Sequence, residues 1–144
     1  MIKLCSLARL NDTVTACSAR HVVTLVRDES RLFRPPGVEA DNHLWLQMDD
    51  IADPIDGMIA PSEEHVDRLV KFATRWDRAQ PMVVHCFAGI SRSTSAAFIS
   101  ACALAPERDE AEIACASAMR RRPLRPIRGS WHSAMPISGG RDAW

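Results

Sequence analysis

The 144-residue sequence lacks the features by which a membrane protein or a general nucleic-acid-binding protein is usually identified. It has no tyrosine, only six glycines and no net charge at pH 7, and its apolar runs stay well below the roughly 20 residues that cross a bilayer. Without an excess of basic groups, general binding to nucleic acid or to acidic membranes is disfavoured. The composition, 47% hydrophobic and 25% charged, is typical of a globular chain. We therefore expect one domain over residues 1–144 that has no nucleic-acid or membrane partner.

Disulfide and metal-site patterns are also missing. The five cysteines are odd in number and form no C-x-x-C pair, which fits neither a disulfide framework nor a zinc site. Four histidines show no metal-ligand spacing and are expected at the surface or at strand ends: His21, His43, His65 and His132. The first residues contain no sustained apolar run of the kind that a secretory signal needs. The sequence therefore predicts a cytoplasmic protein without a metal site, and we expect a monomer.

Short β-branched or apolar runs predict strands over residues 21–26, 43–48 and 81–85, with a further candidate strand over residues 2–7. Helices are predicted between and after them. One extends from Ser62, a capping residue, to Trp76, and residues 93–104 are apolar on nearly every side. Another begins at Asp109 and ends with the arginines at 120–122. This order predicts an α/β architecture in which part of the sheet is parallel.

The chemistry is concentrated in residues 83–95, VVHCFAGISRSTS, where an apolar strand leads into a cysteine and an arginine opens an apolar helix. We refer to residues 86–92 as the cradle loop. Backbone N–H groups of such a loop, at a helix N-terminus, point at a bound oxyanion. Gly89 lets the loop close tightly, and the Arg92 guanidinium matches two oxygens of a phosphate. The same positive surroundings would make Cys86 a thiolate nucleophile.

The pattern His-Cys-x5-Arg-Ser, formed by His85, Cys86, Arg92 and Ser93, resembles the signature of the cysteine-dependent protein tyrosine and dual-specificity phosphatases. The resemblance extends over residues 1–122. It implies a central, mostly parallel twisted sheet with helices on both faces and the cradle loop at the carboxyl end of a strand. Because the chain is short and has no long upstream recognition loop, it resembles a compact, bacterial-type member of the dual-specificity branch.

This resemblance implies hydrolysis of phosphomonoesters in two steps, without a metal or cofactor. Cys86 would attack phosphorus to form a cysteinyl-phosphate, which water would then hydrolyse. Ser93 corresponds to the hydroxyl that eases departure of the thiolate, and His85 to the residue that orients the cysteine. The residues implied to hold the phosphate, through backbone N–H groups and the arginine side chain, are Phe87, Ala88, Gly89, Ile90, Ser91 and Arg92.

A general acid is also needed, because an alkoxide or phenoxide leaves poorly without a proton. In the family that the sequence resembles, it is an aspartate on a loop after the preceding strand. We assign Asp50, which follows the strand at 43–48 at the position that best corresponds to that pattern. Asp49 would point to the other face by alternation, although Asp49 and Asp53 remain alternatives. Asp56 is more typical of a turn.

The implied substrate is phosphotyrosine in protein, with dual specificity and small phosphomonoesters left open. The interior of the cradle loop has no lysine, which disfavours a highly phosphorylated lipid. The alternative is a catalytically silent adaptor of the same fold, which an absent or misplaced general acid would favour. Residues 123–144 form an atypical end, because Pro126 is not followed by the asparagine usual in the family and the glycines at 139–140 disfavour a final helix.

Overall fold

The structure, a computed structural model, describes residues 1–28, 30 and 33–118. Its elements are β1 (Ile2–Ser6), α1 (Leu10–Cys17), β2 (His21–Leu25), β3 (His43–Trp45), α2 (Glu63–Arg75), β4 (Met82–Cys86), α3 (Arg92–Leu104) and α4 (Glu110–Ala118). Short 3-10 turns over Leu7–Arg9 and Ala40–Asn42 precede α1 and β3. No helix in this part of the chain is long and apolar enough to span a bilayer. The predicted helix end at 120–122 and the atypical segment 123–144 lie outside the described residues.

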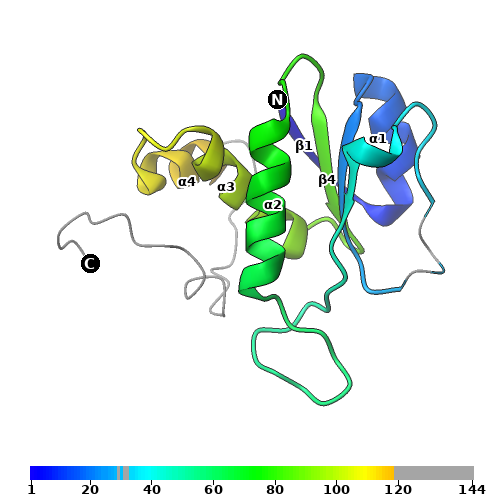
Figure 1. The fold of residues 1–144 in the computed structure, drawn as a ribbon, viewed down its shortest axis with the longest axis vertical. Coiled ribbons are helices and arrows are strands. Elements are labelled where there is room, and N and C mark those ends of the chain that lie inside the picture. Colours follow the sequence, from blue (N-terminus) through cyan, green and yellow to red (C-terminus); the bar gives the residue numbers. More distant parts are fainter. Residues whose placement is uncertain (29, 31–32, 119–144) are drawn as a thin grey trace.

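The four strands form one sheet in the order β1-β4-β2-β3, and each neighbouring pair is parallel. Parallel pairing brings the carboxyl ends of all four strands to the same edge (Figure 1). At that edge β4 leads into the cradle loop, and the segment that joins β3 to α2 projects beyond the sheet. The central position of β4, between β1 and β2, places the cradle loop in the middle of this edge.

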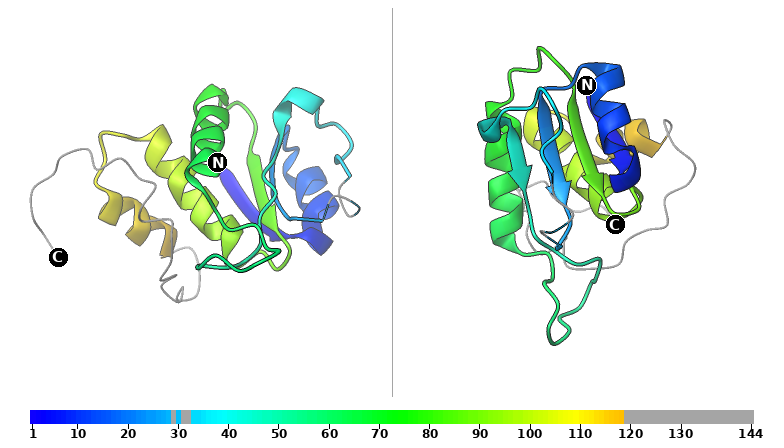
Figure 2. Two further views of the ribbon diagram at one scale, coloured as in Figure 1. Left: turned by 60° about the horizontal axis from the view of Figure 1, so that its bottom comes forward. Right: turned by 90° about the vertical axis from the view of Figure 1, so that its right-hand side faces the viewer.

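Helices cover both faces of the sheet, as Figure 2 shows. On one face α2 and α3 pack against alternate residues of the central strands, and α1 packs against the other face. The larger core contains Val23, Leu25, Leu46, Met48, Val66, Leu69, Phe72, Trp76, Met82, Val84, Cys86, Ala96 and Ile99. The smaller one contains Leu10, Val14, Ala19, Val22, Val38 and Val83. The predicted α/β class, with a parallel sheet between helices, is confirmed.

Local sequence signals account well for α2. Ser62 caps the helix by accepting a hydrogen bond from the His65 N–H, and the His65 side chain accepts in return from the Ser62 N–H. This reciprocal pair satisfies two donors that a helix start leaves open. Val66, Leu69, Phe72 and Ala73 form the buried face of this helix. The predicted helix is therefore confirmed, with Ser62 and Trp76 as its caps.

Two elements differ from the sequence expectation. The strand predicted over residues 43–48 ends at Trp45. The last ladder bond runs from the Leu46 N–H to the Thr24 carbonyl, and the next acceptor on that side, the Val26 carbonyl, binds the Trp45 indole N–H at 2.7 Å instead. Helix α1 was not predicted, since its sequence LNDTVTAC has few strong helix formers. Burial of Leu10 and Val14 against the sheet stabilises it instead.

Candidate active site

The cradle loop joins the end of β4 to the start of α3. Gly89 has a φ of +75° and turns its backbone N–H toward Cys86, whose Sγ accepts it at 3.2 Å. The loop is also attached to the turn that follows β1, because the Phe87 carbonyl accepts a hydrogen bond from the Leu7 N–H at 3.2 Å. These contacts curl the backbone around the sulfur at the N-terminus of α3, where the helix dipole favours negative charge.

The pKa of the Cys86 thiol lies below its ordinary value although the residue is 1% exposed. Burial is the largest single influence and raises the pKa, because it disfavours the charged thiolate. Hydrogen bonds from the Ser93 hydroxyl and from the backbone N–H groups of Ser93, Gly89 and Ile90 together outweigh it. The Ser93 Oγ lies 3.4 Å from the Cys86 Sγ. The site therefore favours a thiolate, which is the nucleophilic form of cysteine.

Gly89 leaves no room for a side chain. A Cβ built on it would lie 2.6 Å from the Cys5 carbonyl carbon and 2.6 Å from the Ser6 nitrogen, both backbone atoms of β1. Gly57 offers a matched comparison, because its φ is +76° but its Cβ would meet nothing within 4 Å. An alanine at position 57 would therefore lose stability through the left-handed backbone alone, whereas an alanine at position 89 would also clash with β1.

We expect Gly57→Ala to lower the free energy of unfolding by about 1–2 kcal/mol through backbone strain alone. Gly89→Ala should lose a further amount of about 1–3 kcal/mol, because the clash forces β1 and the cradle loop apart, and its affinity for vanadate should fall. Urea unfolding and vanadate titration of both variants measure these effects. Equal losses of stability with unchanged vanadate binding would contradict the close packing of the loop against β1.

Arg92 is the first residue of α3, and a backbone carbonyl holds one end of its guanidinium group in place. Its Nη1 donates to the Met48 carbonyl at 2.9 Å, and the side chain is 11% exposed. Its Nε is buried and makes no hydrogen bond within the described residues, although it lies 3.9 Å from the Asp50 Oδ1. A guanidinium that is held by one N–H group and has another N–H group unengaged can donate hydrogen bonds to an oxyanion in the loop.

The two neighbouring aspartates have different surroundings. Asp50 faces the cradle loop: its Oδ1 accepts a hydrogen bond of 2.6 Å from the Ser91 hydroxyl, and its side chain is half exposed. Asp49 instead pairs with Arg27, two residues after β2, at 3.1 Å, and it accepts the Ile59 N–H at 2.8 Å. Of the two, Asp50 is the carboxylate that contacts the loop.

His85 lies behind the cradle loop, on the face of β4 opposite to the Cys86 side chain by strand alternation. Its Nε2 is 2.7 Å from the Thr24 Oγ1, and the same hydroxyl is 2.8 Å from the Nε2 of His43. The roles of Thr24 and His43 were not predicted from the sequence; the one local signal was a threonine among the apolar residues that follow His21 in the strand HVVTL. His43, expected at the surface or at a strand end, begins β3 and is half-buried.

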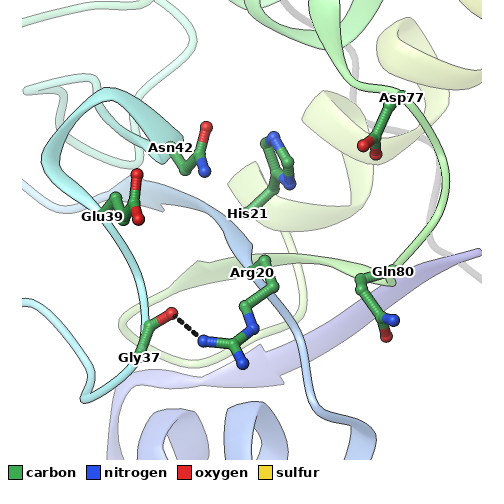
Figure 3. Close-up of a pocket in the computed structure, with 7 residues that line it drawn as sticks. All are labelled: Arg20, His21, Gly37, Glu39, Asn42, Asp77 and Gln80. Carbon is green, nitrogen blue, oxygen red and sulfur yellow. Dashed lines mark hydrogen bonds between the residues drawn. The ribbon is translucent and has the colours of Figure 1, made fainter.

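A cavity of about 280 Å³ lies at the opposite end of the sheet, near the first residues of β2 and the approach to β4. Figure 3 shows its polar lining, in which the Arg20 guanidinium donates to the Gly37 carbonyl at 2.8 Å. The residues that line it are Arg20, His21, Gly37, Glu39, Asn42, Asp77 and Gln80. It contains none of the predicted site residues, so the chemistry of the cradle loop does not depend on it.

The structure thus pairs the side chain of Ser93 with that of Cys86 and brings Asp50 to Arg92 and Ser91, at the carboxyl end of β4, with His85 on the opposite face of that strand from Cys86. Asp53 and Asp56, the other aspartates considered, lie exposed on the projecting segment. The Ser91 side chain is an addition that sequence reasoning missed, since only its backbone was assigned a role.

Comparisons with solved structures find the same fold. Human DUSP28 superposes with a TM-score of 0.69 at 18% identity, and the alignment covers 92% of this chain and 87% of that one. The PTP-2 phosphatase of Cydia pomonella gives 0.64 at 16% identity, with 88% and 79% covered. OH1 from the Orf virus gives 0.59 at 17% identity, with 83% and 70% covered. A search of curated proteins found no match.

At the level of sequence, the profile of the family "Protein-tyrosine phosphatase" matches residues 55–126, half of the chain. The match includes the whole cradle loop and Ser93, whereas Asp50 lies upstream of it. The predicted membership in the superfamily of cysteine-dependent tyrosine and dual-specificity phosphatases is confirmed by this match and by the shared fold. The chain belongs to the protein-tyrosine phosphatase family.

Proposed function

We propose that this phosphatase hydrolyses phosphotyrosine in proteins through a cysteinyl-phosphate on Cys86. One observation carries the proposal: the Cys86 sulfur is the focus of hydrogen-bond donors that lower its pKa, at a helix N-terminus that begins with Arg92. A buried cysteine without a chemical role does not need such surroundings. A thiolate that must attack a phosphorus atom does.

In the first step, the Cys86 thiolate forms an S–P bond as the P–O bond to the leaving group breaks. Arg92 and the backbone N–H groups of the loop hold the three non-bridging oxygens, where charge must be stabilised. Asp50, in its protonated form, gives its proton to the leaving oxygen. The carboxylate so formed then takes a proton from the water that attacks phosphorus. The S–P bond breaks, phosphate leaves, and the Ser93 hydroxyl stabilises the returning thiolate.

Exposed apolar side chains on the segments that flank the site support an aromatic phosphoester in a peptide as the substrate. Five of the exposed large apolar side chains in the described residues lie on the cradle loop or on the segment that joins β3 to α2: Phe87, Ile90, Ile55, Met58 and Ile59. Exposed apolar side chains that gather on neighbouring segments are typical of a binding surface. The cradle loop offers no lysine for additional phosphates. OH1 from the Orf virus is named a tyrosine phosphatase with triple substrate specificity, so activity on phosphoserine is worth testing here as well.

The test is hydrolysis by the purified protein in the presence of a metal chelator. We expect turnover of a small aryl phosphate, inhibition by vanadate, and a higher kcat/KM for a phosphotyrosine peptide than for the same peptide with phosphoserine. Folded protein that binds vanadate without turnover would contradict the proposal and favour a silent adaptor. Preference for phosphoserine or for a phosphorylated lipid would retain the chemistry but overturn the substrate.

The assignment of the general acid has its own test in a pair of neighbouring variants. We expect Asp50→Asn to lower kcat by about 10²–10⁴-fold for an alkyl phosphate or for phosphotyrosine, whose leaving groups need a proton. For an aryl phosphate with an acidic phenol, the loss should be much smaller. Asp49→Asn is the matched control, because it removes the Arg27 ion pair but no contact with the cradle loop. A leaving-group dependence in Asp49→Asn instead would transfer the role to Asp49.

A further inference from the structure

Behind the cradle loop, three side chains from three neighbouring strands form a continuous polar row. Thr24 of β2 lies between His85 of β4 and His43 of β3, and its Oγ1 is 2.7 Å and 2.8 Å from their Nε2 atoms. Thr24 and His85 are fully buried. The sheet register pairs Thr24 directly with His85, so the contact is built into the pairing of β2 with β4. We call Thr24, His43 and His85 the β-sheet row.

The chemistry of these groups restricts how the protons are arranged. The pKa of His85 is lowered to about 4, first because burial disfavours the charged ring and second because His43 is close. The pKa of His43 is lowered by burial and by the charge of Arg34. Both rings are therefore neutral near pH 7. A hydroxyl has one hydrogen, so Thr24 donates to only one Nε2, and the other Nε2 carries a proton that it donates to Thr24.

The surroundings of His85 indicate which histidine donates a hydrogen bond to Thr24 and which accepts one from it. The backbone of Cys86 raises the His85 pKa, an effect expected of a nearby carbonyl rather than of an N–H group. The Nδ1 of His85 is buried and has no hydrogen-bond partner of good geometry among the described residues. Because Nε2 is engaged by Thr24, we place the single ring proton on Nδ1, the nitrogen left to face a carbonyl, and the His85 Nε2 then accepts from Thr24. His43 then donates from its Nε2 to the Thr24 oxygen.

We propose that Thr24 and His43 are positioning residues of the phosphatase reaction, which hold the His85 ring in one tautomer and orientation against the backbone at Cys86. The inference rests on the proposed function for its consequence in catalysis. Cys86 is the first residue of the cradle loop, and the N–H groups that stabilise its thiolate follow within seven residues. A fixed backbone at Cys86 keeps these donors directed at the sulfur. A His85 ring free to turn would let the loop relax and weaken them.

The arrangement of protons is measured directly by the nitrogen-15 shifts of the histidine rings in the full chain. We expect His85 to be protonated on Nδ1 and His43 on Nε2 in the wild type. In Thr24→Val, which keeps the shape and removes the hydroxyl, His43 should become a mixture of tautomers. The opposite tautomers in the wild type would overturn this arrangement of hydrogen bonds. Unchanged nitrogen-15 shifts of His43 in Thr24→Val would overturn it as well.

The consequence for the site is measured by the pH at which iodoacetamide alkylates Cys86 at half its maximal rate. We expect Thr24→Val to raise this pH by about 0.5–1 unit, the size expected for one lost hydrogen bond. His43→Phe should give a smaller rise in the same direction, and Thr24→Ser should restore the wild-type value. His21→Phe is the control, because His21 is also a half-buried histidine but lies at the far end of β2.

The outcomes separate a positioning role from a merely structural one. An unchanged alkylation pH in Thr24→Val, or an equal shift in His21→Phe, would overturn the proposal. If Thr24→Val does not fold, His43→Phe carries the test against Thr24→Ser, since both keep a hydroxyl at position 24 beside His85 and only His43→Phe should raise the alkylation pH. Alkylation and ring shifts do not require turnover. The wild type could show the expected tautomers, and Thr24→Val the expected rise in alkylation pH, while the wild type hydrolyses no phosphoester. That result would support the roles of Thr24 and His43 and refute the proposed function.

Discussion

Cys86→Ser is expected to lower kcat for an aryl phosphate by about 10⁴-fold or more, because it removes the nucleophile itself. The cradle loop lowers the pKa of the Cys86 thiol below its ordinary value, whereas a serine hydroxyl ionises at far higher pH than any thiol. The variant should still bind vanadate and a phosphotyrosine peptide, since Arg92 and the backbone donors remain. Steady-state kinetics and calorimetric titration measure the two properties separately.

Cys102→Ser is the matched control for this experiment. Cys102 lies on α3, nearly three turns beyond the cradle loop, and burial raises the pKa of its thiol. The control should therefore keep wild-type turnover. Substantial residual activity in Cys86→Ser, or an equal loss in Cys102→Ser, would show that Cys86 is not the nucleophile.

Arg92→Lys should cause the second largest loss, about 10³-fold or more in kcat/KM. Lysine keeps the positive charge but not the planar fork, which here holds the Met48 carbonyl with one donor and leaves others for the phosphate. A lysine that retains the Met48 contact cannot also bridge two phosphate oxygens. Vanadate affinity should fall together with kcat/KM, and titration beside kinetics measures both.

Arg108→Lys is the control for the general effect of replacing an arginine by lysine in this protein. Arg108 is half exposed and pairs with Glu112 at 3.7 Å on the surface of the described chain, away from the cradle loop. It should lose neither turnover nor vanadate binding, since an exposed ion pair contributes little. Wild-type kcat/KM in Arg92→Lys would mean that charge alone is sufficient and that the fork geometry is unimportant.

The features that sequence could predict are those determined by residues near one another in the chain. The cradle loop, the apolar β4 and the capped α2 each depend on a continuous segment, and each is found as predicted. Helix α1 was missed because its stability comes from burial of Leu10 and Val14 against residues of other strands. Tertiary packing overrides weak local propensity in such a case.

The site shows the same division. Cys86, Arg92 and Ser93 follow from one motif, while the surroundings of Asp50 depend on contacts across 41 residues, from Ser91. Strand alternation predicted that Asp49 and Asp50 would point in different directions, and the Arg27 and Ser91 contacts agree with that. The β-sheet row joins residues 19 and 61 positions apart, and only the sheet register brings them together.

The central claim is that turnover proceeds through a phosphate bound to Cys86. It is tested most directly by mixing enzyme with a rapidly cleaved aryl phosphate, quenching with acid within the first turnover, and locating phosphate by mass spectrometry of the digested protein. We predict phosphate on the peptide that contains Cys86, in greater amount in Ser93→Ala because its thiolate leaves more slowly. Release of phenol without any phosphate on Cys86, in either protein, would contradict the mechanism.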